Sequence, residues 1–393
     1  MIFAHPILDL EDSAVLDEIA DLRTQLAEYL RVPRRWTGSL RRTALARAIR
    51  GSNSIEGINV DLDDAAAAVD QEEAMSADER TYAEILGYRQ ALGYVLAMAR
   101  DEHFTLDATA LRGMHFMLLS HDLSKSPGQY RTHEIFVHDD RTDQTVYTGP
   151  DPDAVPGLVE ELVLDLTRHE NEDPLVQAAM AHLNLVMIHP FRDGNGRMAR
   201  ALQTLVLARK GIAEPEFASI EEWLGANTDD YYRVLSVTGG GAWNPGNDSH
   251  LWVKFNLRAH HMQAQTVRAR WAQAAAAWRV LDELTATHRL PDRVSDALYD
   301  AALGFRLRRS SYVARTGTDE RTASRDFRAM VDAGLLTAVG QTKGRHYRAG
   351  PALGPVREAT RRATPIVDPY PWLPARLLQP SGPPASRDGR QPL

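Results

Sequence analysis

The chain has 393 residues, of which 44% are hydrophobic and 25% charged, and its formal net charge is −8 at pH 7. These proportions exclude a fibrous or mostly disordered chain, and the length favours two or three domains. The chain has no cysteine, which excludes disulfides and thiolate metal sites and suits a reducing compartment such as the cytoplasm. The negative charge argues against a protein that coats nucleic acid.

The N-terminal half reads as a series of helices. The acidic N-terminus predicts no secretory signal, and the chain lacks the run of about 18 apolar residues that a membrane span needs. Apolar residues spaced by three and four predict a first helix from about residue 10 to Pro33, and a second runs from Ser39 to GSNSIEG, where Gly57 ends it. Further helices are expected at about 77–100, 107–120, 153–170 and 173–188.

The interval 128–150 interrupts this series. Within it, the β-rich runs EIFVH and QTVYT flank the turn-forming DDRTD, so we expect a short β-hairpin. Helices then resume after Arg200 and continue at about 218–236 and 249–286. The fold class expected for this region is therefore mainly α, with one hairpin.

The pattern changes towards the C-terminus. From about 295 to 350 it reads helix, turn, helix and two short β-like runs, LLTAVG and HYRAG, which predicts a winged helix-turn-helix. The remainder is rich in proline and has no long apolar period, so we expect a flexible tail. The expected divisions are an N-terminal helical region (1–105), a central core (106–245), connecting helices (246–289), the winged helix (290–350) and the tail (351–393).

The segment HPFRDGNGRMAR, residues 189–200, carries the chemistry. His189 ends one helix and is a candidate general base. Gly194, Asn195 and Gly196 open the next helix, where backbone N–H groups and the helix dipole favour phosphate. Asp193 is a candidate ligand for Mg²⁺. Two arginines one turn apart, Arg197 and Arg200, are able to approach the same polyphosphate.

Each of these residues also has a purely structural interpretation. A lone His189 would more often stabilise a helix C-terminus, and a lone Asp193 would more often be an N-cap. Arg197 and Arg200 could be a solvated face. The joint occurrence of base, carboxylate, glycine nest and paired arginines within twelve residues favours the functional interpretation.

This segment resembles the Fic signature HPFx(D/E)GNGRxxR at every defined position. The resemblance implies a Fic-fold helical bundle and transfer of AMP from ATP to a Ser, Thr or Tyr hydroxyl of a protein, with His189 as the base and Asp193 holding Mg²⁺. By the same resemblance, the phosphates are cradled by Gly194, Asn195 and Gly196, and Asn195 orients the α-phosphate. The β- and γ-phosphates are neutralised by Arg197 and Arg200.

Two other segments resemble parts of the same family. The expected hairpin at 128–150 is similar to the flap that clamps the target's hydroxyl-bearing segment. The stretch NTDDYYRVL is similar to the family's adenine-pocket segment, in which Tyr231 or Tyr232 would contact the base. Core packing of either tyrosine is an equally good interpretation.

Residues 52–57, SNSIEG, are similar to the (S/T)xxxE(G/N) inhibitory motif found N-terminal to the core of many Fic proteins. Ser52, Glu56 and Gly57 occupy its defined positions. The resemblance implies that Glu56 pairs with Arg200 and blocks productive ATP binding. A glutamate before a helix-ending glycine is also common by chance. In some relatives this glutamate also assists removal of AMP, an alternative that stays open here.

The sequence leaves other classes of function and partner open. The winged helix groups Arg321, Arg325 and Arg328 on its second helix, as DNA binding would need, but winged helices also dock proteins. The chain could therefore be a DNA-binding regulator with a nucleotide-sensing Fic core. Another alternative is transfer of a different phosphate-linked group, although Gly196 departs from the lysine that Doc kinases carry there. A second copy of the chain is a further partner to consider.

Overall fold

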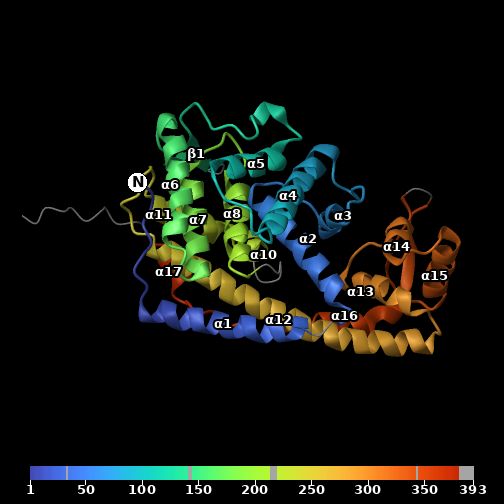
Figure 1. Cartoon of the computed structure of the whole chain (residues 1–393). Coiled ribbons are helices and arrows are strands. Elements are labelled where there is room, and N and C mark those ends of the chain that lie inside the picture. Colours follow the sequence, from blue (N-terminus) through green and yellow to red (C-terminus); the bar gives the residue numbers. More distant parts are fainter. Residues whose placement is uncertain (32–33, 140–143, 213–218, 342–343, 380–393) are drawn as a thin grey trace, which may run out of the picture.

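The computed structural model describes residues 1–31, 34–139, 144–212, 219–341 and 344–379. Helices make up most of this structure (Figure 1), which confirms the mainly α fold class. In the first half the helices are α1 (Leu10–Arg31), α2 (Thr37–Ile55), α3 (Leu62–Asp70), α4 (Glu79–Met98), α5 (Ala108–Leu119), η1 (Leu123–Lys125), η2 (Pro152–Ala154), α6 (Val155–Arg168), α7 (Pro174–Ile188) and α8 (Asn195–Arg209).

In the second half the helices are α10 (Glu221–Ala226), α11 (Thr228–Gly239), α12 (His250–Thr287), η3 (Asp292–Val294), α13 (Ser295–Leu303), α14 (Arg309–Thr316), α15 (Glu320–Asp332), η5 (Pro351–Leu353), α16 (Gly354–Thr360) and α17 (Leu373–Leu377). Across the described ranges, none of the helices combines the length and the apolar character that a membrane span requires.

Two helices, α7 and α8, lie in the middle of the larger hydrophobic core (Figure 1). α7 is apolar on nearly all sides, which is the pattern of a helix buried all round. Its start is defined locally, because the Asp173 side chain accepts from the Leu175 N–H at 2.8 Å and Pro174 occupies the first turn. The loop from α7 to α8 is therefore held between two rigid helices.

The 38-residue helix α12 joins this larger core to a second one. It is about 57 Å long at the usual rise per residue, and Figure 1 shows it running beside α1 and then beneath α13. Trp252 near its start is buried in the larger core, whereas Trp278 near its end is buried in the second core. The two cores are thus connected by a continuous helix.

The second core contains α13, α14 and α15 followed by a two-stranded antiparallel sheet. Its strands are β3 (Leu336–Val339) and β4 (His346–Ala349), with Leu336 opposite Ala349. Helices and strands follow one another in the order that a winged helix-turn-helix requires. The winged-helix assignment and the domain boundaries stay predictions.

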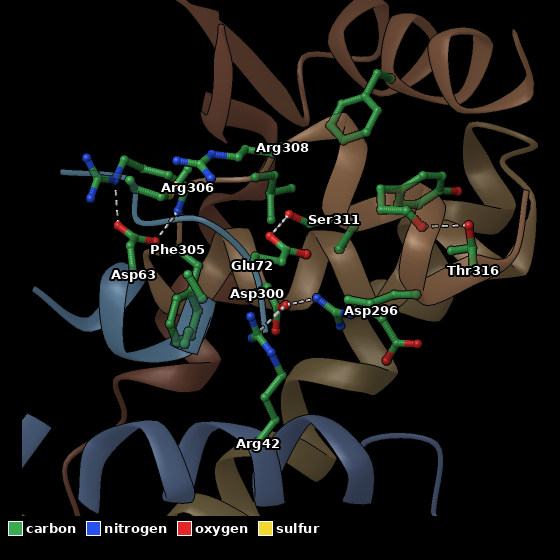
Figure 2. A pocket seen from close by; sticks show the side chains of 18 of the residues that line it. Arg42, Asp63, Glu72, Asp296, Asp300, Phe305, Arg306, Arg308, Ser311 and Thr316 are labelled. Atoms are coloured by element: carbon green, nitrogen blue, oxygen red, sulfur yellow. Dashed lines mark hydrogen bonds and ion pairs between the residues drawn. The ribbon is translucent and has the colours of Figure 1, made fainter. Parts of the chain in front are cut away.

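Helix α2 extends from the larger core to the second core, and Figure 2 shows the junction that its first half makes there. The buried carboxylate of Asp300, on α13, accepts from Ser39 Oγ at 3.0 Å and from Arg42 Nη1 at 3.3 Å. Nearby, Arg306 Nε donates to Asp63 Oδ2 at 2.6 Å. The pocket in Figure 2 is therefore lined by charges that largely neutralise one another.

The expected hairpin is confirmed. Its strands, β1 (Phe136–Asp139) and β2 (Gln144–Thr148), are antiparallel, with Val137 opposite Tyr147. The turn at 140–143 lies outside the described residues. The Tyr147 hydroxyl donates to the Met187 carbonyl at 2.7 Å, so the hairpin is attached to the last turn of α7.

The prediction of a flexible tail over 351–393 is wrong for 351–379, and residues 380–393 lie outside the described part. Helix α16 packs in the second core through Val356, and α17 packs in the larger core through Leu373. The Tyr370 hydroxyl donates to Asp12 Oδ1 at 2.9 Å. A few separate apolar residues anchor this segment, so no long apolar period was available to reveal it.

Candidate functional site

His189 follows the last turn of α7 in a left-handed backbone conformation, with φ 51° and ψ 58°. Its Nδ1 lies 3.2 Å from the Val186 carbonyl oxygen, and a bond donated there leaves the lone pair of Nε2 free. Burial lowers the pKa of His189 to about 4, so the ring is neutral at pH 7. His189 is thus in the protonation state that a general base needs.

Arg131, at the base of the hairpin, holds the backbone around His189. Its guanidinium donates to the carbonyl oxygens of His189 at 2.8 Å, His133 at 2.9 Å and Pro150 at 2.6 Å, while its backbone N–H donates to Pro190 at 3.0 Å. Carbonyl groups at a helix C-terminus lack partners within the helix, and Arg131 supplies one. The sequence analysis missed this residue, because a lone arginine after PGQY carries no recognisable signal.

The loop between α7 and α8 is fastened from inside by Asn195. Its side-chain amide accepts from the Phe191 N–H at 2.9 Å and donates to the Phe191 carbonyl at 2.8 Å. The Phe191 ring stacks on His115, with centroids 3.8 Å apart, and His115 Nε2 bonds to the Asp193 carbonyl at 2.9 Å. The Asn195 side chain therefore shapes the loop; its orientation of an α-phosphate stays a prediction.

The first turn of α8 forms a concave site for an anion. Gly194 is the N-cap, in the left-handed conformation with φ 76°, which few residues other than glycine adopt. A Cβ on Gly196 would clash with the carboxylate of Glu56, so this carboxylate lies directly against the helix start. Unpaired N–H groups and the positive helix end favour a negative group at such a place. An anionic side chain thus lies beside the helix start at which the sequence predicts phosphate binding.

The same carboxylate is paired with Arg200, as the sequence predicts. Arg200 Nη2 lies 2.7 Å from Glu56 Oε1, and Arg200 Nε donates to Ser52 Oγ at 2.7 Å. Arg200 is fully buried, whereas the Glu56 side chain is 28% exposed. Gly57 follows α2 with φ 75°, a conformation that suits the end of a helix. Ser52 and Glu56 therefore both contact Arg200, and the inhibitory role of Ser52, Glu56 and Gly57 stays a prediction.

Asp193 and Arg197 belong to a network of ion-paired side chains that no motif in the sequence predicts. Asp193 Oδ2 lies 2.8 Å from Lys125 Nζ, which lies 2.7 Å from Glu84 Oε1. Glu84 Oε2 in turn lies 2.6 Å from Arg197 Nη1. Burial would raise the pKa of Glu84, but the charge of Arg197 and the hydrogen bonds of Lys125 and Arg197 lower it to about 2. Glu84 is therefore ionised and fixes Arg197.

The two tyrosines differ in environment. Tyr231 is buried in the larger core, and its hydroxyl lies 3.0 Å from His182 Nε2. Tyr232 is about half exposed, and its hydroxyl donates to the carbonyl of Ile55, directly before Glu56, at 2.8 Å. Tyr231 therefore has the core role that the sequence left open, and of the two only Tyr232 has an exposed ring for a ligand.

The residues present fit an anionic, metal-bound ligand. Arg200 Nη1 and Arg197 Nε are buried beside the start of α8 and have no hydrogen-bond partner within the described ranges. The absence of a side chain on Gly196 leaves room for a group against the helix start. The carboxylate of Asp193, ahead of the same helix, is a ligand of the kind that Mg²⁺ prefers. A nucleotide with Mg²⁺ satisfies this combination.

These features place a helix start that suits an anion next to a neutral histidine, and the chain can now be compared with known proteins. Residues 105–207 match the model of the Fic/DOC family. This part of the chain is therefore similar to Fic/DOC-family domains.

Curated relatives carry names that state an activity. The chain is 30% identical over 252 residues to "Protein adenylyltransferase Fic" of Nematostella vectensis, covering 62% of this chain and 54% of that protein. It is 26% identical over 257 residues to "Protein adenylyltransferase fic-1" of Caenorhabditis briggsae, covering 61% of this chain and 45% of that protein. The chain thus matches about half the length of these relatives.

A solved structure shows the same fold over more of the chain. The crystal structure of a Fic family protein from Desulfovibrio desulfuricans G20 superposes with a TM-score of 0.55 and 24% identity, covering 88% of this chain and 98% of that chain. At this identity the likeness establishes the fold alone.

Proposed function

We propose that this chain is a protein adenylyltransferase that Glu56 holds in a state of low activity. One observation carries the proposal. His189, neutral and with Nε2 free, is one loop away from a helix start against which a carboxylate already lies. A base beside an anion nest is what transfer of a phosphate-linked group to a hydroxyl requires.

In the proposed reaction, His189 Nε2 takes the proton of a Ser, Thr or Tyr hydroxyl on a target protein. The hydroxyl oxygen attacks the α-phosphorus of ATP, the bond to the β-phosphate oxygen breaks, and pyrophosphate leaves. Backbone N–H groups of residues 194–196 and the guanidinium groups of Arg197 and Arg200 stabilise the phosphate charge. Mg²⁺, when bound to Asp193, would neutralise further phosphate charge.

Glu56 opposes this reaction in two ways. Its carboxylate occupies the space against Gly196, and it uses the Arg200 hydrogen bond that a terminal phosphate would otherwise receive. The bond to Arg200 favours a negative group and the space beside Gly196 holds only one group, so Glu56 and a phosphate compete for one place. ATP would then bind weakly or in a non-productive position until α2 releases the carboxylate.

The position of the transferred label tests this function. Wild type, Glu56→Gly and His189→Ala are incubated with candidate target proteins and ATP labelled on the α- or the γ-phosphate. Transfer of the α-label alone, strongest for Glu56→Gly and absent for His189→Ala, is expected. Transfer of the γ-label would mean phosphorylation, and release of AMP from a pre-labelled target would reveal the reverse activity.

A second candidate function is binding of duplex DNA by the C-terminal unit. Helix α15 exposes Arg321, Arg325 and Arg328 on one face, spaced so that they lie along a single stripe. Arg345, directly before β4, and Arg348, within β4, are also exposed. Binding that weakens steeply as salt rises, and that Arg325→Ala reduces, would support this function. Binding that does not respond to salt would oppose it.

A further inference from the structure

Lys125 has a position that the proposed mechanism does not explain. Its ammonium lies between two carboxylates, 2.8 Å from Asp193 Oδ2 and 2.7 Å from Glu84 Oε1. The turn that carries it, η1, is attached to the loop a second time, because Arg192 Nη1 donates to the Ser124 carbonyl at 3.1 Å. The fold thus directs Lys125 at the proposed metal ligand.

Both oxygens of Asp193 are already engaged. Oδ1 accepts from the Gly194 N–H at 2.6 Å, and Oδ2 accepts from Lys125. Mg²⁺ binds carboxylate oxygens at about 2.0–2.1 Å. A divalent ion on Oδ2 would therefore lie close to the ammonium, where two positive charges repel each other strongly. Lys125 and a metal ion are unable to share this oxygen at these distances.

We propose that Lys125 is the resident counter-ion of Asp193, which Mg²⁺ must displace, and that Lys125 thereby sets the affinity of the loop for the metal. The proposal rests on the proposed role of Asp193 as a metal ligand. Glu84 gives the displaced ammonium a place to remain, because this carboxylate is already fixed by Arg197 at 2.6 Å. The loop is thus charge-balanced before the metal arrives.

Binding of Mn²⁺ without nucleotide, followed by electron paramagnetic resonance, tests this proposal. Lys125→Met should bind Mn²⁺ at least about tenfold more tightly than wild type, because one competing charge is gone. Lys125→Arg, which keeps the charge, should resemble wild type. Lys210→Met removes the same charge from an exposed position at the far end of α8 and should have no effect.

Two results decide whether Lys125 sets the affinity of the loop for the metal. Loss of Mn²⁺ binding in Asp193→Asn would locate the ion at this carboxylate. If Lys125→Met then binds Mn²⁺ no more tightly than wild type, the proposal is wrong. Lys125→Gln provides the same comparison if the methionine variant does not fold. Since no transfer is measured, failure here is distinct from failure of the proposed adenylyltransferase activity.

A separate observation concerns α2, which has one half in each core. Its start packs in the second core through Trp36 and Leu40, and near its end Ser52 binds Arg200. Ser52 lies 13 positions after Ser39, which corresponds to about 20 Å of helix. The helix that presents Glu56 is therefore also part of the C-terminal core.

Besides the apolar contacts, one buried carboxylate joins α2 to the C-terminal core. Asp300 accepts from Arg42 of α2, as Figure 2 shows. It also accepts from Ser39 of α2, and from Arg315 of α14 at 2.5 Å. A buried carboxylate needs such donors, so separating α13 from α2 would be costly. The position of α2 is thus linked to that of α13 and α14.

Between its two ends α2 crosses α10 without space to slide. A Cβ on Gly51 would overlap the Glu221 backbone, and a Cβ on Gly225 would lie 2.8 Å from the Gly51 Cα. This close crossing is a pivot just before Ser52. A change in the direction of α2 at Ser39 would therefore turn the segment that carries Glu56.

We infer that the junction of α2 with α13 and α14 restrains α2, and so sets how firmly Glu56 holds Arg200. This inference rests on the proposed inhibitory role of Glu56. A ligand of the C-terminal unit that moves α13 or α14 would then change the nucleotide site from a distance. The junction at Asp300 is the physical connection between the C-terminal unit and Glu56.

ATP affinity in an Asp300→Asn variant tests the coupling. We expect ATP to bind at least about fivefold more tightly than in wild type, together with faster amide exchange in residues 45–57. Arg293→Ala is the matched control, because Arg293 pairs with Asp326 at 2.7 Å inside the same core without contact to α2. It should leave ATP affinity unchanged.

Combination with Glu56→Gly gives the decisive comparison. If the junction acts through Glu56, adding Asp300→Asn to Glu56→Gly should not increase ATP affinity further. Additive effects, or equal effects of Asp300→Asn and Arg293→Ala, would overturn the inference. Ser39→Ala, which removes a single hydrogen bond from Asp300, replaces Asp300→Asn if that variant is unfolded.

Discussion

The carboxylate of Glu56 lies against the Cα of Gly196, in space that the Cβ of any other residue would occupy. The two residues are far apart in the chain and meet because α2 ends at the start of α8. In the proposed mechanism, the glycine that lets a phosphate approach the helix start also admits the inhibitory side chain. Regulation and substrate binding would then use one position.

The first prediction concerns ATP affinity in a His189→Ala background, where turnover is prevented. Glu56→Gly should bind ATP at least about tenfold more tightly than its Glu56 parent, because a charge-assisted bond to Arg200 no longer competes. Glu56→Gln, which keeps the shape but loses the charge, should lie between them. Isothermal titration calorimetry provides the three dissociation constants. Identical constants would show that Glu56 does not occupy the phosphate position.

The second prediction is the pH dependence of transfer by Glu56→Gly. A base must be neutral, and burial lowers the pKa of His189 from 6.5 to about 4. As the pH falls, kcat/KM should therefore stay constant through 6.5 and decline only towards about 4. The charge of Glu56 raises the pKa of His189, so its removal favours the neutral form of the His189 ring further. An acid limb centred at or above 6.5 would mean that another group limits the reaction, or that His189 is solvated.

The third prediction concerns the loop. Asn195→Ala removes both partners of the Phe191 backbone and leaves buried polar groups unpaired, which costs about 1–3 kcal/mol for each group. Because two groups lose their partner, urea denaturation should show a loss of stability of about 2–6 kcal/mol. Transfer by Glu56→Gly/Asn195→Ala should be lower than by Glu56→Gly. Full stability with lost transfer would instead indicate that the amide acts on the nucleotide.

The fourth prediction separates the two tyrosines. Tyr231→Phe should lower the free energy of unfolding by about 1–3 kcal/mol, because His182 loses a buried partner. Tyr232→Phe should have little effect on stability. It removes the hydrogen bond to the Ile55 carbonyl, directly before Glu56, so Glu56 should be held less firmly and ATP affinity should rise slightly. Thermal unfolding and ATP titration of both variants check this. The reverse pattern would contradict the assignment of Tyr231 to the core.

The chain's local patterns predicted the features that depend on residues close in sequence. The Fic segment is continuous, so His189, Asp193 and the glycines were visible together, and Glu56 was found through a second short motif. The alternation in EIFVH and QTVYT was enough for the hairpin. These features required no knowledge of the tertiary structure.

Apart from the pair of Glu56 with Arg200, which the motif resemblance implies, features that depend on distant contacts were not predicted. Lys125, Glu84 and Arg131 lie in segments with no motif and reach the loop only through the packing of α4, η1 and the hairpin. Helix α3 was missed because its run of alanines shows no apolar period. Residues 351–379 were misread because isolated anchors such as Tyr370 give no periodic signal.

The central claim is that a competent transferase is held inactive by Glu56. The most direct measurement is the initial rate at which label from α-labelled ATP enters protein, compared among wild type, Glu56→Gly and Glu56→Gly/His189→Ala. A slow wild type, a rate at least about tenfold higher for Glu56→Gly and no transfer by the double variant are expected. Equal rates for wild type and Glu56→Gly, or transfer that persists without His189, would contradict the account.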